Sequence, residues 1–243
     1  MVSHLERVAK TYDRCIVEFG NEDAPDYDNL PGHITSDPDY PAWKAEAERQ
    51  SYKSECKKEI KDFLSPAKGM NFIQLGCSLN LMFKGYDKWP SAYYGVDISG
   101  QTIRLLKDFV KKNNISIGAL HCGSIHATPF DDSFFDIGEC IGVLEYYERA
   151  FVLEAIREFH RILKPGGRFV LDIPNSESPS GRMAMRIEGY MGRPDLFDMP
   201  PRVFEDMIEN YFEIEDSDRM RAENRGASHA GMMYFYYLRR KKS

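Results

Sequence analysis

Hydrophobic residues recur along this chain with two different periods, and the change between them divides the chain into two parts. In 3–19 and 42–64 they recur every three or four positions, which is the period of one helix face, and Ser3 is the predicted N-cap of the first helix. The segment 21–41 is rich in Asp, Pro and Asn and predicts a loop, interpreted as a lid facing a substrate. Residues 1–66 are therefore predicted to form N-terminal helices and a lid loop.

From residue 67 onward, short apolar runs alternate with amphipathic stretches, which predicts a mostly parallel sheet covered by helices on both faces. The segment 176–200 interrupts this order with a methionine-containing helix and is interpreted as a cap insert in a domain spanning 67–243. The last apolar run is continuous and is expected inside the sheet or covered, because a flat apolar edge promotes aggregation. The predicted strands are 71–75, 92–97, 115–122, 135–144, 168–173, 212–220 and 232–238, and the predicted helices between them are 100–114, 148–164 and 201–211.

Composition and charge narrow the classes of function. The 243 residues carry a net charge of −6, which disfavours wholesale binding to nucleic acid or to an anionic membrane. No segment approaches about 18 uninterrupted apolar residues, and the charged N-terminus lacks the apolar core of a signal peptide. The chain has five cysteines, an odd number, and no two of them are spaced as a CxxC pair. This argues against a disulfide framework and against a zinc site. The sequence therefore predicts a protein of the reducing cytoplasm, and it assigns no oligomeric state.

A strand, a glycine turn, a short helix and a second strand are predicted between Met70 and Ser99. The first strand ends at Gly76, and the second ends at Asp97, a carboxylate about 20 residues later, which is the spacing of a nucleotide-binding βαβ unit. The glycine lets backbone N–H groups approach a ligand, and the carboxylate can accept hydrogen bonds from ribose hydroxyls. With a single glycine the turn by itself is a weak signal.

Four segments that follow one another along the chain strengthen the case for a nucleotide-binding fold. They are IQLGC, GVDIS, CGSIHATPFDDSFFDIGECIGVLEYY and LKPGGRFVLDIPN. This set resembles the class I S-adenosylmethionine-dependent methyltransferases of the type 11 group. The resemblance covers 70–175 well. It implies an α/β fold, a Rossmann-like, doubly wound, seven-stranded sheet with the last strand antiparallel, here with an N-terminal helical extension. It also implies S-adenosylmethionine as cofactor, S-adenosylhomocysteine as product, and a small-molecule acceptor methylated on O, N, S or C mainly by positioning.

The resemblance also implies a set of cofactor-binding positions. Asp97 would accept hydrogen bonds from the ribose hydroxyls, Ile98 would pack on the adenine, and Ile141 would face the methionine part. The residues after the third strand would bind the adenine, and the backbone of the glycine turn would line the methionine. The full set is Gln74, Gly76, Cys77, Ser78, Asp97, Ile98, Ser124, Ile125 and Ile141.

The chain departs from the family pattern at several of these positions. Gln74 replaces an acid that often helps to hold the ammonium of the cofactor, and Ser78 and Asn80 replace two glycines. Ser124 replaces a common adenine-binding Asp. Tyr146 stands where relatives that bind a metal carry His, so no metal is predicted.

The acceptor is expected at the tip of the fourth predicted strand. Glu145, Tyr146 and His126 are candidate catalytic residues, and Tyr12, Tyr146 and Tyr147 are candidate substrate contacts. Aromatic residues of the N-terminal part and methionines of the 176–200 insert favour an apolar or aromatic acceptor. A small molecule is the predicted partner, with no nucleic acid and no membrane.

Two alternatives remain open. An NAD(P)-dependent oxidoreductase would share the βαβ unit and Asp97, although the GxGxxG pattern fails after Gly76. A non-catalytic homologue that binds the cofactor without turnover would account for the altered turn and for Gln74.

Overall fold

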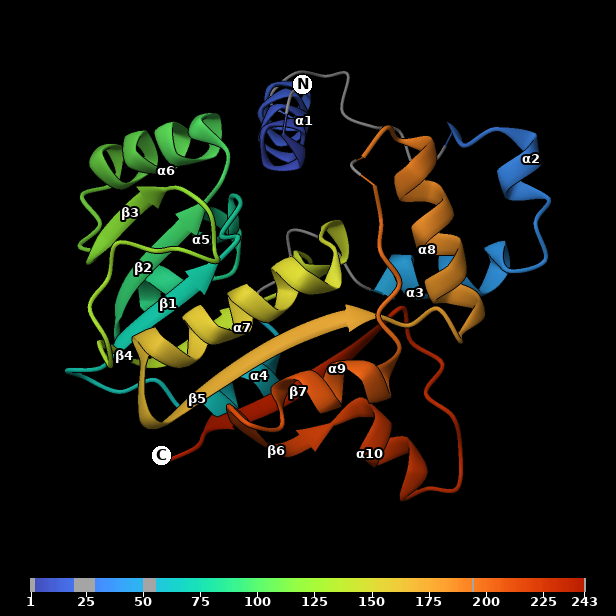
Figure 1. The fold of residues 1–243 in the computed structure, drawn as a ribbon. Helices are drawn as coiled ribbons and strands as arrows, with labels where there is room; N and C mark the ends of the chain where they lie inside the picture. The colour runs from blue at the N-terminus through green and yellow to red at the C-terminus, as the bar shows by residue number, and fades with distance from the viewer. Residues whose placement is uncertain (1–2, 20–28, 50–55, 194, 243) are drawn as a thin grey trace.

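The computed structural model describes residues 3–19, 29–49, 56–193 and 195–242 (Figure 1). Their strands form one sheet in the order β3-β2-β1-β4-β5-β7-β6, in which β7 runs antiparallel to both of its neighbours and the other pairs are parallel. This confirms the predicted fold class, and the final apolar strand lies inside the sheet as predicted. The strands are β1 (Asn71–Leu75), β2 (Ala92–Asp97), β3 (Ala119–Cys122), β4 (Phe135–Cys140), β5 (Leu163–Pro174), β6 (Phe212–Ser217) and β7 (Met233–Arg240).

The strand order places a switch point beside β1. From β1 the chain moves outward to β2 and β3 and then returns to β4 on the other side of β1. In open α/β sheets, ligands bind at such a switch point, outside the carboxyl ends of the strands. The ends of β1, β2 and β4 are therefore the expected position of a ligand site.

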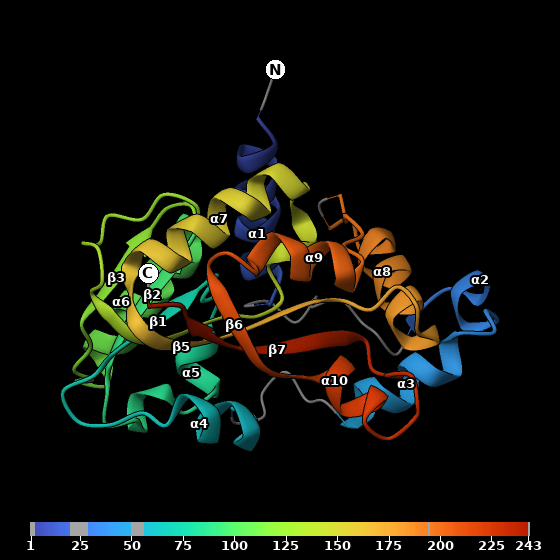
Figure 2. The ribbon, with the colours of Figure 1, turned by 60° about the horizontal axis from the view of Figure 1, so that its bottom comes forward.

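Helices cover both faces of the sheet, and each face has its own core. α7 (Arg149–Ile162) and α9 (Pro201–Ile208) pack on one face, around Phe159 and Phe169. α4 (Lys58–Leu64), α5 (Asn80–Phe83) and α6 (Gly100–Lys112) contribute to the core of the other face, around Phe72. Figure 2 shows α7 and α9 on one side of β5 and β7, with α4 and α5 on the other.

The N-terminal part and the 176–200 insert pack against each other. α2 (Gly32–Thr35) and α3 (Tyr40–Arg49) lie beside α8 (Pro179–Tyr190) at one end of the molecule (Figure 1). Asp39 accepts two hydrogen bonds from the Arg182 guanidinium, at 2.8 and 3.0 Å. The apolar residues of this shared core are Leu30, Ile34, Trp43, Met183 and Ile187.

α1 (His4–Phe19) begins as predicted, with a capping box at Ser3. The Glu6 N–H donates to Ser3 Oγ at 3.2 Å, and the Ser3 N–H donates to Glu6 Oε2 at 2.8 Å. Figure 1 shows α1 between α6 and α8. In the described part of the chain, no helix is both long enough and apolar enough to cross a membrane.

Two predictions for the N-terminal part were wrong in detail. The segment 42–64 is not a single helix, because α3 ends at Arg49 and Cys56 and Lys57 are not helical before α4. The predicted loop 21–41 contains α2 and the start of α3, which pack on α8 and so gain a tertiary partner that the local composition does not reveal. Tyr27 in the predicted loop 21–41 and Tyr52 in the predicted helix 42–64 lie outside the described residues.

Three predicted strands are shorter than expected. β3 begins only at Ala119, and β4 ends at Cys140, because Gly142 turns the chain with φ +69° into η3, a 3-10 helix over Leu144–Tyr146. β6 ends at Ser217, whose hydroxyl accepts from the Met220 N–H and begins the short helix α10 (Asp218–Glu223). Capping by this single side chain therefore starts a helix where the strand was predicted to continue.

Candidate functional site

The turn after β1 requires glycine at position 76. Gly76 has φ +72°, and a Cβ built there would lie 2.3 Å from Val143 Cγ2. The N–H groups of Gly76 and Cys77 both donate to the Val96 carbonyl, at 2.8 and 2.9 Å, so the turn is held against the end of β2. Ser78 follows with φ +43°. The turn therefore combines a left-handed backbone with close packing, and only glycine satisfies both conditions at position 76.

Asp97 joins the turn after β1 to the turn after β2. Its Oδ2 accepts from the Ser78 N–H at 2.7 Å, and its Oδ1 accepts from the Ser99 N–H at 2.9 Å. Burial raises the pKa of this carboxyl to about 6, although the two backbone N–H groups act in the opposite direction. Each carboxylate oxygen can accept a further hydrogen bond. Asp97 thus has the capacity to bind both hydroxyls of a ribose.

The other predicted cofactor positions surround these two turns. Ile125 is buried, and Ile98 and Ile141 are half-buried. The Ser124 hydroxyl lies 2.6 Å from His126 Nδ1, so its hydrogen-bonding capacity is partly used within the chain. Cys77 is fully buried and burial raises the pKa of its thiol, which agrees with a packing role for this side chain.

Gln74 belongs to a buried hydrogen-bond network that sequence reasoning missed. Its Nε2 donates to Glu139 Oε1 at 2.8 Å, and its Oε1 accepts from the Tyr93 hydroxyl at 2.7 Å. The Tyr86 hydroxyl also donates to Glu139 Oε1, at 2.5 Å. Gln74 and Glu139 are register partners on β1 and β4, so an acid stands on β4 directly beside the glutamine on β1. The only signal in the sequence was a second acid, after Asp136, within this predicted strand.

Glu139 makes stability depend on pH. Burial raises its pKa from 4.5 to about 7, so the folded state binds this proton more tightly than the unfolded state does. Protonated Glu139 therefore contributes up to about 3 kcal/mol to the free energy of unfolding. This contribution is fully present below pH 4.5 and is lost as the pH rises through about 7. We expect Glu139→Gln to lose less unfolding free energy than the wild type between pH 5 and pH 8, measured by urea unfolding. Equal losses in the two proteins would contradict this assignment.

α1 covers the ends of β1 and β2 through Asp13, a second residue that sequence reasoning missed. Asp13 Oδ1 accepts from the Ser99 hydroxyl at 2.6 Å and from the Gln101 N–H at 3.1 Å, at the first turn of α6. A carboxylate at a helix N-terminus is electrostatically favourable. The N-terminal extension is thereby attached beside Asp97, and Asp13 contributes to the raised pKa of Asp97.

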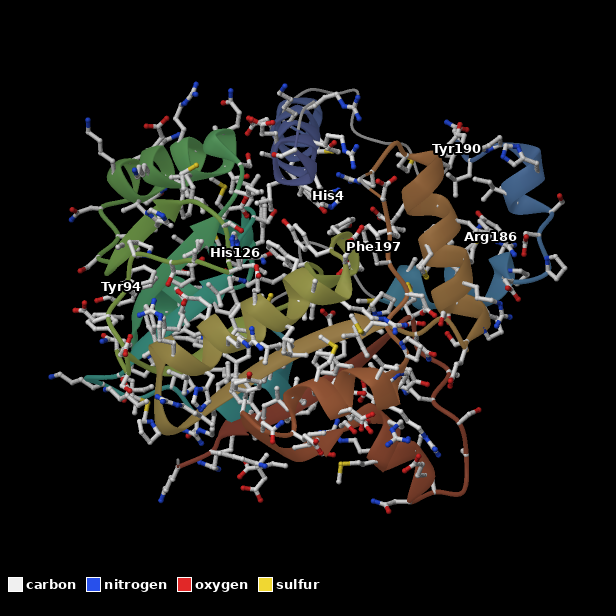
Figure 3. The ribbon with its side chains drawn as sticks, in the orientation of Figure 1. His4, Tyr94, His126, Arg186, Tyr190 and Phe197 are labelled. Atoms are coloured by element: carbon white, nitrogen blue, oxygen red, sulfur yellow. The ribbon has the colours of Figure 1, made fainter. Side chains whose placement is uncertain are left out.

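The predicted substrate residues lie where α1 meets η3, with Tyr12 on α1 and with Tyr146 and Tyr147 at the end of η3. The rings of Tyr12 and Tyr146 meet edge to face with 5.6 Å between centroids, and the Tyr146 hydroxyl donates to Glu188 Oε2 at 3.3 Å. His4 Nε2 lies 2.6 Å from the Tyr146 carbonyl, and the rings of His4 and Phe197 are 5.7 Å apart. Figure 3 shows His4 and Phe197 in the central region between α1 and α7. Aromatic rings from α1, η3 and the segment after α8 thus gather beyond the end of β4.

Two of the three candidate catalytic residues share this region. Glu145 and Tyr146 are neighbours in η3. The pKa of Glu145 is raised well above its usual value, mainly by burial and to a smaller extent by the charge of Asp172. His126 contacts Ser124, and its ring lies 4.8 Å from that of Phe151. The third predicted tyrosine, Tyr147, stacks on Phe151 at 4.0 Å.

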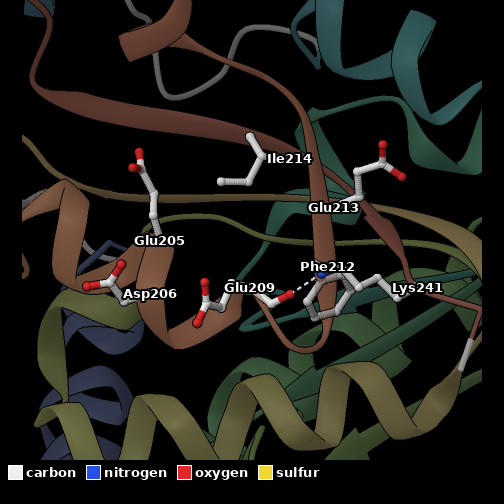
Figure 4. Close-up of a pocket in the computed structure, with 7 residues that line it drawn as sticks. All are labelled: Glu205, Asp206, Glu209, Phe212, Glu213, Ile214 and Lys241. Carbon is white, nitrogen blue, oxygen red and sulfur yellow. Dashed lines mark hydrogen bonds between the residues drawn. The ribbon is translucent and has the colours of Figure 1, made fainter.

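Two surface hollows lie away from the ends of β1, β2 and β4. One of about 320 Å³ lies between α9 and β6, where the Lys241 ammonium donates to the Glu209 carbonyl (Figure 4). Another of about 360 Å³ opens at the amino ends of β1 and β2, around Trp89 and Pro90. Neither contains a predicted site residue.

Comparison with known proteins agrees with this geometry. Residues 73–171 match the model of a family described as a methyltransferase domain. An uncharacterised protein of Methanocaldococcus jannaschii is 32% identical over 119 residues, which cover 49% of this chain and 44% of that protein. The uncharacterised methyltransferase YcgJ of Bacillus subtilis is 24% identical over 99 residues, which cover 41% of this chain and 38% of YcgJ. The match therefore spans less than half the length of these curated relatives.

Solved structures show the same fold over a longer span. Geranyl diphosphate C-methyltransferase from Streptomyces coelicolor A3(2), in complex with Mg²⁺, geranyl diphosphate and S-adenosyl-L-homocysteine, superposes with a TM-score of 0.64 at 16% identity, covering 98% of both chains. The YcgJ structure from Bacillus subtilis superposes with a TM-score of 0.56 at 14% identity, covering 76% of this chain and 97% of that one. Residues 73–171 of this chain thus match the methyltransferase domain family, and the sheet around them has the Rossmann-like fold of the solved methyltransferase.

Proposed function

We propose that this protein is an S-adenosylmethionine-dependent methyltransferase that acts on a small-molecule acceptor. The observation that carries this proposal is Asp97, which ends β2 and faces the turn at Gly76 through its hydrogen bond from the Ser78 N–H. The family match over 73–171 and the structural neighbours that contain S-adenosyl-L-homocysteine support the same cofactor.

The residues present suit the cofactor. Asp97 has one protein hydrogen bond on each carboxylate oxygen and can accept two more from the ribose. The backbone of the turn at Gly76 would approach the methionine part, and Ile98 and Ile125 offer apolar surface for the adenine. When bound, S-adenosylmethionine supplies an electrophilic methyl group on a positively charged sulfur.

The acceptor would be held by the aromatic group beyond β4. Tyr12 and Tyr146 can position a small molecule and exclude water, which is the main contribution of a protein to a reaction whose reactive group is carried by the cofactor. The net charge of −6 supports a small acceptor over a nucleic acid. Glu145, beside Tyr146, would accept a proton where the attacking atom must lose one.

Calorimetric titration of the wild-type protein tests this function. We expect S-adenosylmethionine and S-adenosylhomocysteine to bind with dissociation constants of about 1 to 100 µM, a free energy of about −5 to −8 kcal/mol. NADH is titrated in parallel, because an oxidoreductase would use the same βαβ unit. Binding of NADH without binding of S-adenosylhomocysteine would overturn the proposal in favour of that alternative.

A further inference from the structure

The loop of residues 123–134, here named the β3–β4 loop, joins β3 to β4 and carries Ser124 and Ile125, two of the predicted cofactor positions. Its first residue is held against β2, because the Gly123 N–H donates to the Asp97 carbonyl at 2.9 Å. The loop therefore starts at the ligand end of the sheet, beside the carboxylate that is proposed to bind the ribose.

Two backbone donors near the start of the β3–β4 loop have no acceptor within the described part of the chain. They are the N–H groups of Ser124 and Ile125. The Ala127 N–H donates to the Ser124 carbonyl at 3.4 Å, so these residues form a turn. Ring nitrogens of a purine accept hydrogen bonds from such N–H groups. The position of the two donors is set by the backbone of the loop, and hence by whatever holds that backbone.

Two side chains of α7 hold the loop beyond this turn. Glu158 is 7% exposed, and its Oε1 accepts from the N–H and from the hydroxyl of Thr128, at 2.7 and 2.6 Å. Arg161 donates to Glu158 through Nε and Nη2, at 2.7 Å in each case. Its Nη1 also donates to the Phe130 carbonyl at 2.8 Å and to Asp132 Oδ1 at 2.7 Å. α7 thus contacts the loop at three residues through one pair of side chains.

The pair of Glu158 and Arg161 is ionised and geometrically constrained. Burial opposes the ionisation of Glu158, but the hydrogen bonds from Arg161 and Thr128 outweigh it, so the pKa of Glu158 is lowered. Two parallel hydrogen bonds between a guanidinium and a carboxylate fix orientation as well as distance. The backbone adds a further link, because the Ser133 N–H donates to the Arg161 carbonyl at 2.8 Å. The position of the loop therefore follows the position of α7.

We propose that Glu158 and Arg161 are positioning residues that fix the β3–β4 loop for recognition of the purine base of the cofactor. This inference rests on the proposed function, because it assigns the base to this loop. The loop is held at Gly123 on one side and at Thr128 on the other, and the two N–H groups without an acceptor lie between these points. Glu158 and Arg161 act on the base through the loop, without contact of their own.

Discrimination between two bases measures this role. S-inosylhomocysteine differs from S-adenosylhomocysteine in the base alone, because an oxygen replaces the exocyclic amine and a ring nitrogen gains a hydrogen. Each compound is titrated by calorimetry into the wild type, Glu158→Gln and Arg161→Lys. The matched controls are Glu154→Gln and Arg149→Lys, which change exposed residues of the same helix. Urea unfolding of each variant confirms that it is folded at the temperature of the titration.

We expect the wild type to prefer S-adenosylhomocysteine by about tenfold or more, because a site that hydrogen-bonds one base leaves groups unpaired with the other. Glu158→Gln and Arg161→Lys should each weaken S-adenosylhomocysteine at least about fivefold and reduce the preference to about threefold or less, since a displaced loop misaligns its donors. Both control variants should bind within about twofold of the wild type and keep its preference.

A second pair of variants tests the same link with the ionic pair intact. Thr128→Val removes the hydroxyl that donates to Glu158, and Thr128→Ser keeps this donor. The preference for S-adenosylhomocysteine should fall in Thr128→Val and stay close to that of the wild type in Thr128→Ser. This pair also gives an answer if a change in Glu158 or Arg161 prevents folding.

Equal weakening of both compounds in the variants of Glu158 and Arg161, with the preference unchanged, would overturn the inference, since the pair would then support only the fold. Unchanged affinity for both compounds, or a wild type that binds the two equally, would also overturn it while leaving the proposed function intact. A wild type that binds neither compound would refute the proposed function and this inference together.

Discussion

Asp97→Ala is expected to weaken S-adenosylhomocysteine binding by at least about 100-fold. The substitution removes two charge-assisted hydrogen bonds to the ribose, each worth about 1.5 to 3 kcal/mol when the acceptor is ionised. It also removes the acceptor of the Ser78 N–H and Ser99 N–H, so the two turns lose the side chain that joins them. Calorimetric titration at pH 8 measures the loss, well above the pKa of Asp97 at about 6.

Two comparisons make this result specific. Asp131→Ala, which changes an exposed acid, should leave the affinity unchanged. The wild type should bind more weakly as pH falls through about 6, because protonation removes the charge that strengthens the ribose bonds, and Asp97→Ala should show no such dependence. Wild-type affinity in Asp97→Ala would place the ribose elsewhere.

Gly76→Ala is expected to destabilise the protein by about 2 to 4 kcal/mol and to abolish cofactor binding at micromolar concentrations. A left-handed backbone costs an L-residue about 1 to 2 kcal/mol, and Gly76 has φ +72°. The remaining cost comes from the new methyl group, which would lie 2.3 Å from Val143 Cγ2 and must displace that side chain or the turn. Urea unfolding and titration of S-adenosylhomocysteine measure the two effects.

The chain offers a matched control for each part of this cost. Gly85 has φ +74° with nothing within 4 Å of its built Cβ, so Gly85→Ala should lose only the backbone part, about 1 to 2 kcal/mol. In the double variant Gly76→Ala/Val143→Ala the clash is relieved, and the destabilisation should fall below the sum of the two single variants. Strict additivity would mean that Val143 does not oppose the substitution.

The part of the site that lies within a single βαβ unit could be predicted from the sequence. Gly76 and Asp97 are separated by one helix and one strand, and the hydrophobic pattern shows where both strands end. The same pattern placed the final apolar strand inside the sheet. These features depend on local backbone requirements and on burial of a whole strand, which residue types record directly.

Contacts between distant segments were decided only by the tertiary structure. Glu139 became the neighbour of Gln74 through the register of β4 against β1, and a shift of one residue would have turned it to the opposite face. Asp13 reached the first turn of α6, and Arg182 reached Asp39, across 88 and 143 residues of sequence respectively.

By itself, then, the sequence determined the order of the strands along the chain, the glycine turn and the carboxylate that ends β2. The tertiary structure alone decided which acid lies beside Gln74, how α1 covers the strand ends, and that the N-terminal helices share a core with the 176–200 insert. The physical reason is that a strand or a turn is specified by neighbouring residues. The partners of a buried carboxyl or a helix face are instead set by register and packing over the whole sheet.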